Sequence, residues 1–171
     1  PDSCDLTYYN TRGFTDNDRF TEVTLKNGTL KIENSVGGEG YISEIVLADN
    51  KVTLETKPDT GYVFDGWYTD ASEGSKIDFD GNISQNTTLY SKFSPIISNV
   101  IVSDLPANIT YGDSLKLEIS GIEVASGYDS TDAAYKWYEG ETDFGADSAE
   151  YTYTVNDTNE HTISCDITLG G

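Results

Sequence analysis

The chain has 171 residues, enough for one large or two small domains, and it carries 30 acidic against 10 basic side chains, a formal net charge of -20. A charge of this sign repels phosphate groups, so nucleic acid and anionic membranes are not expected as partners. Hydrophobic residues make up 36% and aromatic residues 12% of the sequence, which is enough to build packed cores and predicts a globular protein of two small domains.

Residues 1–21 form a polar, turn-rich lead-in segment that includes TRGFTDNDRF. Its pattern fits either a first pair of strands or the tail of a preceding domain, and both interpretations stay open. No stretch of the chain approaches the ~20 apolar residues of a membrane helix, and none resembles a signal peptide. The chain also contains no methionine. We therefore expect a piece of a longer protein, with any export signal or wall anchor outside it and no membrane insertion within it.

Residues 22–94 show the period-two alternation that is typical of half-buried strands. The alternating positions are Leu30 and Ile32; Tyr41, Ser43, Ile45 and Leu47; Val52, Leu54 and Thr56; and Leu89, Ser91 and Phe93. Between these runs lie short segments such as Asn27-Gly28 and Asp80-Gly81, whose residues favour tight turns. This pattern predicts short antiparallel strands joined by turns.

A second series of strands is predicted over residues 95–171, with a boundary near residues 94–96, where Ser94-Pro95 interrupts the pattern. The alternating positions in this half are Leu115, Leu117 and Ile119; Tyr135 and Trp137; Tyr151, Tyr153 and Val155; and Ile163, Cys165, Ile167 and Leu169. No segment keeps a 3.6-residue period over three helical turns. Both halves are therefore predicted to be all-β.

The motif over residues 52–93 consists of an alternating strand, the turn PDTGY, the run FDGWY and a closing strand TTLYSKF. It resembles the Listeria-Bacteroides repeat, the internalin B type in its divergent form, of bacterial surface proteins, and the resemblance spans about residues 22–94. It implies a small antiparallel β module in which Trp67 is a core residue. Strict alternation places Phe64 and Trp67 on opposite sides of the strand unless Gly66 introduces a bulge.

The second half carries the strand motifs LKLEISG, YKWYEG and SAEYTYTVNDTNEHTISCDITL. Their order resembles a bacterial immunoglobulin-like domain, which implies a β-sandwich around Trp137. Domains of the antibody type place a disulfide beside that tryptophan, but residues 115–119 offer no cysteine, so Cys165 is expected to be a buried, unpaired thiol. A bond to Cys4 is not expected, because the two cysteines lie at opposite ends of two successive domains. With 77 residues, from 95 to 171, the domain is short enough to lack a strand.

Residues that could carry catalysis are few. The single histidine, His161, lies at the start of a predicted strand, where a solvent-facing side chain is expected. Two isolated cysteines do not have the spacing of zinc ligands. Acids over residues 15–19 and 78–82 stand at calcium-like spacing but lack the terminal glutamate of a calcium loop. A glycosidase would also need a cleft around its paired carboxylates, which two thin β modules seldom provide. We expect no enzyme, no cofactor and no catalytic or metal site.

The function that these observations favour is a non-catalytic spacer or adhesion region of a bacterial cell-surface or secreted protein, monomeric and located outside the cell or in the cell wall. The alternatives are a binding module for a host glycan or protein, and an accessory region of a larger secreted glycosidase or protease. For a binding module, the candidate residues are the tyrosines least committed to a core, Tyr8, Tyr9, Tyr128 and Tyr138. The residues assigned to the structural core are Phe64, Trp67, Trp137 and Cys165.

Overall fold

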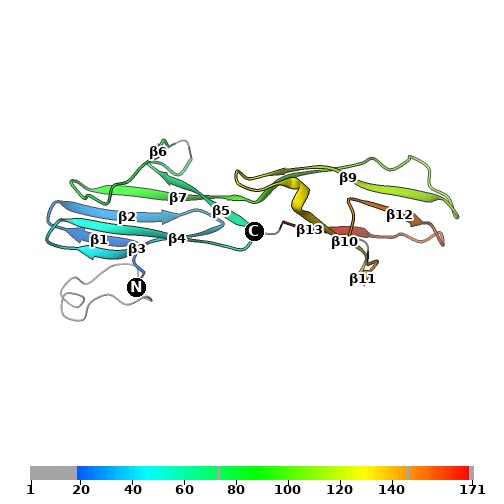
Figure 1. Cartoon of the computed structure of the whole chain (residues 1–171), viewed down its shortest axis with the longest axis horizontal. Helices are drawn as coiled ribbons and strands as arrows, with labels where there is room; N and C mark the ends of the chain where they lie inside the picture. The colour runs from blue at the N-terminus through cyan, green and yellow to red at the C-terminus, as the bar shows by residue number, and fades with distance from the viewer. Residues whose placement is uncertain (1–18, 73, 146, 170–171) are drawn as a thin grey trace. The chain divides into compact units, whose positions relative to one another are not determined.

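The predicted strands are present in a computed structural model of the chain, which describes residues 19–72, 74–145 and 147–169 (Figure 1). The described residues contain no α-helix; the one helical element is a short 3-10 turn, η1 (Ser130–Asp132). The all-β prediction is therefore confirmed. The chain divides into two compact units, with the boundary in the sequence between Pro95 and Ile96.

Unit 1 is built from a larger sheet and a two-stranded sheet. Its strands are β1 (Glu22–Leu25), β2 (Gly28–Asn34), β3 (Gly38–Val46), β4 (Lys51–Pro58), β5 (Tyr62–Tyr68), β6 (Lys76–Ile77) and β7 (Thr87–Pro95). The larger sheet has the order β1-β2-β7-β5-β6, and β3 pairs with β4 as a hairpin. All neighbouring strands pair antiparallel except β2 and β7, which run parallel. The resemblance to the repeat implied an antiparallel module, so this one parallel pair was not expected. Because these two strands are far apart in the sequence, local turn signals gave no indication of their pairing.

The core of unit 1 lies where the two sheets and their flanking segments meet. Its buried members are Phe20, Val23, Leu25, Leu30, Ile32, Ile42, Ile45, Val52, Ile83 and Leu89, with Leu54, Trp67, Ile77 and Phe79 packed against them. Phe20 belongs to the polar lead-in segment of residues 1–21, yet its side chain is 0% exposed. Its backbone N–H donates to the carbonyl of Ile42, and the Ile42 N–H donates to the carbonyl of Phe20 at 2.8 Å. Phe20 is thus an integral part of the unit 1 core.

The predicted alternation fails in β3. The sequence pattern put one face of this strand at Tyr41, Ser43, Ile45 and Leu47. In the structure Ile42 and Ile45 are buried, and Leu47 is an exposed residue beyond the strand. The register with β4 shifts between Ile42 and Glu44, which marks a bulge. Because a bulge adds one residue to a strand, the side chains after it point to the opposite face, and the predicted face is correct only at Ile45.

A second bulge, in β5, places Phe64 and Trp67 together. The register with β7 shifts between Phe64 and Gly66, and Gly66 has a φ of 147°. The two rings meet edge to face with centroids 5.4 Å apart. Trp67 packs against the unit 1 core, while Phe64 is half-buried and lies 5.5 Å from Phe93, centroid to centroid. The glycine therefore allows two large rings of the motif to fill one space.

Replacing Gly66 with alanine should destabilise unit 1 by about 1–3 kcal/mol, because an L side chain at this φ is strained. The free energy of unfolding, measured by urea denaturation, checks this. Gly121→Ala is a suitable control, since Gly121 lies in a strand at an ordinary φ and an added Cβ would be in normal van der Waals contact at 3.5 Å from Ile101. If each variant lost equally little free energy of unfolding in its own unit, relative to the natural chain, the bulge would not need a glycine.

Unit 2 consists of two three-stranded antiparallel sheets that pack face to face. Its strands are β8 (Ile97–Val102), β9 (Ser114–Val124), β10 (Ala133–Glu139), β11 (Thr142–Asp143), β12 (Glu150–Thr154) and β13 (Ile163–Leu169). The sheet orders are β12-β9-β8 and β11-β10-β13. The buried core consists of Leu115, Leu117, Ile119, Trp137, Tyr153 and Val155. Trp137 and Cys165 are register partners on neighbouring strands, and Cys165 is a free, partly buried thiol.

Candidate functional site

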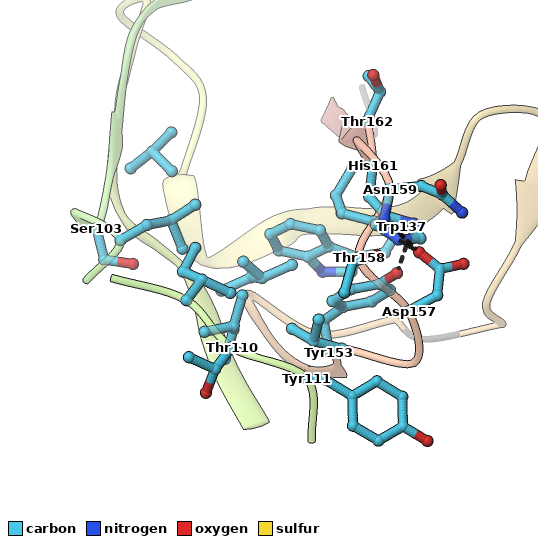
Figure 2. A pocket seen from close by; sticks show the side chains of 17 residues that line it. Ser103, Thr110, Tyr111, Trp137, Tyr153, Asp157, Thr158, Asn159, His161 and Thr162 are labelled. Carbon is cyan, nitrogen blue, oxygen red and sulfur yellow. Dashed lines mark hydrogen bonds and ion pairs between the residues drawn. The ribbon is translucent and has the colours of Figure 1, made fainter. Parts of the chain in front are cut away.

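A cleft of about 900 Å³ lies within unit 2 (Figure 2). One side is formed by the end of β8 and the segment that follows it, residues 102–111, and the other by residues 157–163. The floor is apolar and comes from both sheets, with Leu115 and Leu117 of β9 and Trp137 of β10. The sequence analysis treated a cleft as seldom found in β modules of this size, and unit 2 nevertheless has one.

The floor of the cleft follows from the alternation of β9 and the anchoring of Trp137. Leu115 and Leu117 lie two residues apart and therefore share the inner face of β9. The Trp137 indole N–H donates to the carbonyl of Ser148 at 2.8 Å, and the Trp137 ring stacks on Tyr151 with centroids 6.2 Å apart. Trp137 is 4% exposed. Its buried N–H is thus satisfied, and the ring is held as part of the core.

The rim of the cleft is apolar where residues 102–111 border it. Leu105 is 50%, Ile109 44% and Tyr111 71% exposed. The hydroxyl of Ser103 is shielded from solvent and has no hydrogen-bond partner among the described residues. Such a group usually has a partner in a folded protein, so its presence at the cleft is unusual.

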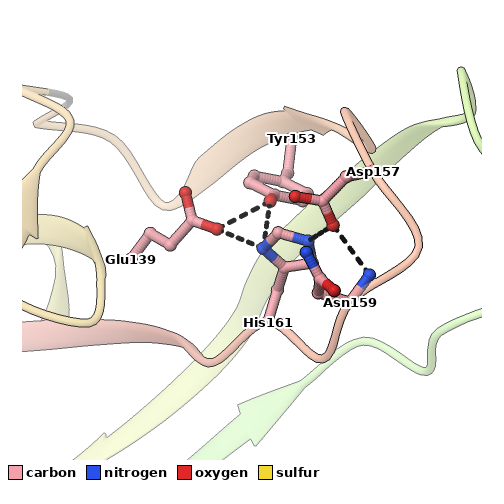
Figure 3. A network of polar contacts seen from close by, with 5 residues as sticks. All are labelled: Glu139, Tyr153, Asp157, Asn159 and His161. Carbon is pink, nitrogen blue, oxygen red and sulfur yellow. Dashed lines mark hydrogen bonds and ion pairs between the residues drawn. The ribbon is translucent and has the colours of Figure 1, made fainter.

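A network of polar contacts around His161 closes the opposite end of the cleft (Figure 3). His161 Nδ1 is hydrogen-bonded to Glu139 Oε1 and lies 2.9 Å from the Tyr153 hydroxyl, which itself donates to Glu139 Oε1 at 2.8 Å. His161 Nε2 is hydrogen-bonded to Asp157 Oδ1 at 2.9 Å. The backbone N–H of Asn159 donates to the same Asp157 oxygen at 2.7 Å. Both ring nitrogens therefore face carboxylates.

The network shifts the pKa of each member. Hydrogen bonds to Glu139 and then Asp157 raise the pKa of His161 above its usual value of 6.5. The pKa of Glu139 is lowered by its hydrogen bonds from Tyr153 and His161, and that of Asp157 by the Asn159 backbone N–H and then His161. Burial and the hydrogen bond to Glu139 raise the pKa of Tyr153 to about 12. These directions favour a charged imidazolium between two carboxylates and a neutral tyrosine.

The expectation of a solvent-facing His161 is wrong. Its side chain is 22% exposed and contacts residues from β10, β12 and the loop before β13. Asp157 lies four residues earlier and is brought back by the loop, a pairing that the local sequence could have suggested. Glu139 is contributed by β10, where it is the register partner of Ile163. This second contact depends on strand pairing, which the local sequence around His161 does not reveal.

The network is not arranged as a nucleophilic site. A catalytic histidine needs a ring nitrogen that accepts the proton of a serine, threonine or cysteine. In His161 both nitrogens are hydrogen-bonded to acids, and the neighbouring hydroxyl belongs to Tyr153, whose pKa is raised. Among the described residues, no group of three or more His, Cys, Asp or Glu side chains is placed to hold a metal ion. The arrangement instead ties the loop before β13 to β10 and β12.

The stability of unit 2 should therefore depend on pH. Because the His161 pKa is raised by folding, its contribution is fully present below its unfolded pKa of about 6.5 and is lost as the pH rises through the folded pKa. The contributions of Glu139 and Asp157, whose pKa values are lowered, are lost as the pH falls through their folded values. Melting curves between about pH 3 and 9 should show highest stability between about pH 4.5 and 6.5. His161→Gln should remove the decline above this window; an unchanged decline would contradict the assignment.

The tyrosines proposed as binding residues do not form a common surface in the described part of the chain. Tyr8 and Tyr9 lie outside the described residues. Tyr128, in the turn before η1, and Tyr138, on β10, are both partly buried, and neither lines the cleft. Lys136 lies over the Tyr138 ring at 5.4 Å from its centroid. Tyr111, which is not among the predicted binding residues, is the exposed tyrosine at the cleft.

The residues assigned to the structural core differ in burial. Trp137 is buried, Trp67 and Cys165 are partly buried and pack against the cores of their units, and Phe64 is half-buried beside Trp67. Burial raises the pKa of the Cys165 thiol, which disfavours the reactive thiolate. No described helix is long and apolar enough to cross a membrane.

Comparison with known proteins identifies one segment of the chain. Residues 33–92 match the family model of the Listeria-Bacteroides repeat domain, a repeat found in surface and secreted bacterial proteins. The match runs from the end of β2 into β7 and confirms the predicted repeat. No curated protein and no solved structure matches the chain. The immunoglobulin-like assignment of unit 2 stays a prediction.

Proposed function

We propose that this chain, which carries a Listeria-Bacteroides repeat in residues 33–92, is a non-catalytic spacer or adhesion region of a bacterial cell-surface protein. In this role it holds a distal binding region away from the cell wall. The observation that carries the proposal is the repeat itself, a non-catalytic domain type, folded as a compact β unit and followed directly by a second β unit.

The use of the large side chains supports this function. In unit 1, Trp67 and Phe64 contact each other and the core, and in unit 2 Trp137 is buried and hydrogen-bonded. The one histidine is held between two carboxylates. Each of these side chains is therefore engaged in holding its own unit folded, which is what a spacer requires.

The charge of the chain also suits an exposed spacer. A net charge of -20 keeps a protein soluble and opposes self-association through repulsion between copies. This supports the expected monomer and a location outside the cell or in the cell wall.

A replacement experiment in the bacterium that carries the parent protein tests the proposal. Deleting residues 19–169 should reduce attachment of the cells to their host surface, and inserting two unrelated β domains of equal length should restore it. Restoration identifies a spacer, because only length and rigidity are conserved between the two inserts. Failure of the unrelated domains to restore attachment would contradict the spacer function and identify a specific adhesion surface in this chain.

The remaining alternatives make different predictions for the isolated chain. A glycan-binding module should retain sugars on a glycan array and on mucin, and a host-protein-binding module should bind intact host cells. An accessory region of a secreted glycosidase or protease should raise the activity of the parent enzyme on its polymeric substrate. The spacer proposal expects none of these three results.

A further inference from the structure

We infer that residues 156–162 form a proton-controlled latch at one end of the cleft of unit 2. While the imidazole of His161 is protonated, the latch is held closed. When the ring loses a proton to water, the latch detaches and the two sheets stay folded. The inference goes beyond the spacer function, because it gives unit 2 two interconvertible states, and it does not depend on that function.

The latch has few contacts to hold it in place. Its sequence, NDTNEHT, contains no apolar residue, and every member except His161 is exposed. The nearest backbone hydrogen bonds to the rest of unit 2 are those of Val155, just before the latch, and of Thr162 at its end. Among the described residues, no backbone–backbone hydrogen bond joins residues 156–161 to the sheets. A segment with so few buried contacts opens at a low free energy unless side chains hold it.

The side chain of His161 provides the attachment (Figure 3). Its Nδ1 is hydrogen-bonded to Glu139 at the end of β10 and lies 2.9 Å from the hydroxyl of Tyr153 on β12. The rings of Tyr153 and His161 also contact each other, with centroids 5.7 Å apart. Its Nε2 is hydrogen-bonded to Asp157, which belongs to the latch itself. In the part of the chain that the structure describes, the latch is therefore hydrogen-bonded to the strands through this one side chain.

The balance of donors and acceptors explains why one proton decides the state. Three groups can donate to the two carboxylates, namely the Tyr153 hydroxyl and the two ring nitrogens of His161. The protonated ring carries a hydrogen on both nitrogens, so each carboxylate receives one. In the neutral ring one nitrogen becomes an acceptor, and it then faces a carboxylate or the tyrosine hydroxyl.

The neutral ring loses its bond to β10. The Tyr153 hydroxyl, 2.9 Å from Nδ1, donates to that nitrogen in place of Glu139, and the remaining ring hydrogen stays on Nε2 beside Asp157. Glu139 then has neither donor. A single neutral hydrogen bond to Tyr153 remains, roughly half as strong as a charge-assisted one. Because His161 is 22% exposed, water competes for this bond and the latch detaches.

The charges around the ring set the direction of the switch. The titratable groups that contact it are Glu139 from β10, Tyr153 from β12 and Asp157 from the latch. The two carboxylates raise the pKa of His161 above 6.5, so the latch opens as the pH rises through this raised value. It also opens in acid, where Glu139 and Asp157, whose pKa values are lowered from 4.5 and 3.8, take up protons. The closed state is therefore expected between about pH 4.5 and 6.5.

Opening should uncover one end of the cleft only. Tyr153, which is 7% exposed beside the His161 ring, and Val155 both line the cleft and should become more exposed (Figure 2). Trp137 should stay buried, because its indole is held by the Ser148 carbonyl and by stacking on Tyr151, and neither belongs to the latch. This difference separates opening of the latch from unfolding of unit 2.

NMR of the isotope-labelled chain tests the inference, since the single histidine makes the imidazole signals unambiguous. His161 should titrate with a midpoint above 6.5, and its neutral form should carry the proton on Nε2. With the same midpoint, the backbone order parameters of residues 156–162 should fall from about 0.85 to below about 0.6. The order parameters of β9 and β10 and the signal of the Trp137 indole should not change.

Two matched variants identify the group that controls the latch. Glu139→Gln removes a charge that contacts the ring and should move the His161 midpoint down toward 6.5, together with the transition of the latch. Glu160→Gln removes the same charge from the residue next to His161 in the chain, which is exposed and makes no hydrogen bond or ion pair with the ring. It should leave both midpoints nearly unchanged. His161→Gln should abolish the transition at neutral pH.

Four results would overturn the inference. The first two are order parameters of the latch that stay constant while His161 titrates, and order parameters that change with a different midpoint. The third is loss of order in β9 and β10 at the same midpoint, which would show that unit 2 unfolds as a whole. The fourth is an equal shift of the midpoint in the Glu139 and Glu160 variants. None of these results affects the replacement experiment for the spacer function.

Discussion

Trp137→Ala is expected to destabilise unit 2 by about 3–5 kcal/mol, which is comparable to the whole stability of a small domain. The substitution removes a buried ring from a core of six buried residues and leaves a cavity between the two sheets. It also removes the indole N–H that donates to Ser148, leaving that carbonyl without this partner. Unit 2 should therefore unfold at ordinary temperatures, while unit 1 keeps its own transition.

Urea denaturation followed by NMR measures this effect, because signals from the two units can be monitored separately. Tyr111→Ala serves as the control, since Tyr111 is the exposed ring at the cleft and its removal leaves no internal cavity. Trp137→Phe should lie between the two, because it retains an aromatic ring but not the donor to Ser148. A Trp137→Ala protein with an intact unit 2 transition would mean that the ring does not support the core.

Phe20→Ala should destabilise unit 1 by a similar amount, about 3–5 kcal/mol. The side chain is 0% exposed and belongs to the buried core between the two sheets of unit 1. The backbone hydrogen bonds between Phe20 and Ile42 add to the attachment of this residue, so a chain that begins at Glu22 should be destabilised further. This effect is large for a residue that lies before the first strand.

Thermal unfolding of unit 1, followed by the same separate signals, checks the prediction. Val36→Ala is the matched control, because Val36 is an apolar residue of unit 1 with a highly exposed side chain. If Phe20→Ala and Val36→Ala melted at the same temperature, residues 19–21 would have to be regarded as outside the folded unit.

The features that could be predicted from the sequence are those that depend on neighbouring residues. Alternation correctly identified the inward faces at Leu30 and Ile32 and along residues 115–119, because side chains in a strand point to alternate sides. The Listeria-Bacteroides repeat was recognisable because its turn and aromatic run are contiguous. The sequence also indicated that Phe64 and Trp67 could share one side of the strand only if Gly66 introduced a bulge, and the structure contains this bulge.

The features that could not be predicted depend on residues far apart in the chain. The bulge in β3 has no glycine or proline at Ser43 to indicate it. The parallel pairing of β2 with β7 and the contact of Glu139 with His161 arise only when distant strands come together. The cleft likewise depends on how residues 102–111 and 157–163 are placed around the two sheets. An alternation pattern shows which face of a strand is buried but not how distant segments are placed.

We propose that the large rings serve to hold each of the two β units folded and are not a ligand platform. Acrylamide quenching of Trp137, in a Trp67→Phe background, tests it most directly. The account predicts weak quenching that increases only when unit 2 unfolds, and an emission spectrum that added sugars leave unchanged. An indole that acrylamide reaches freely in the folded protein, and whose emission shifts when a glycan is added, would contradict it.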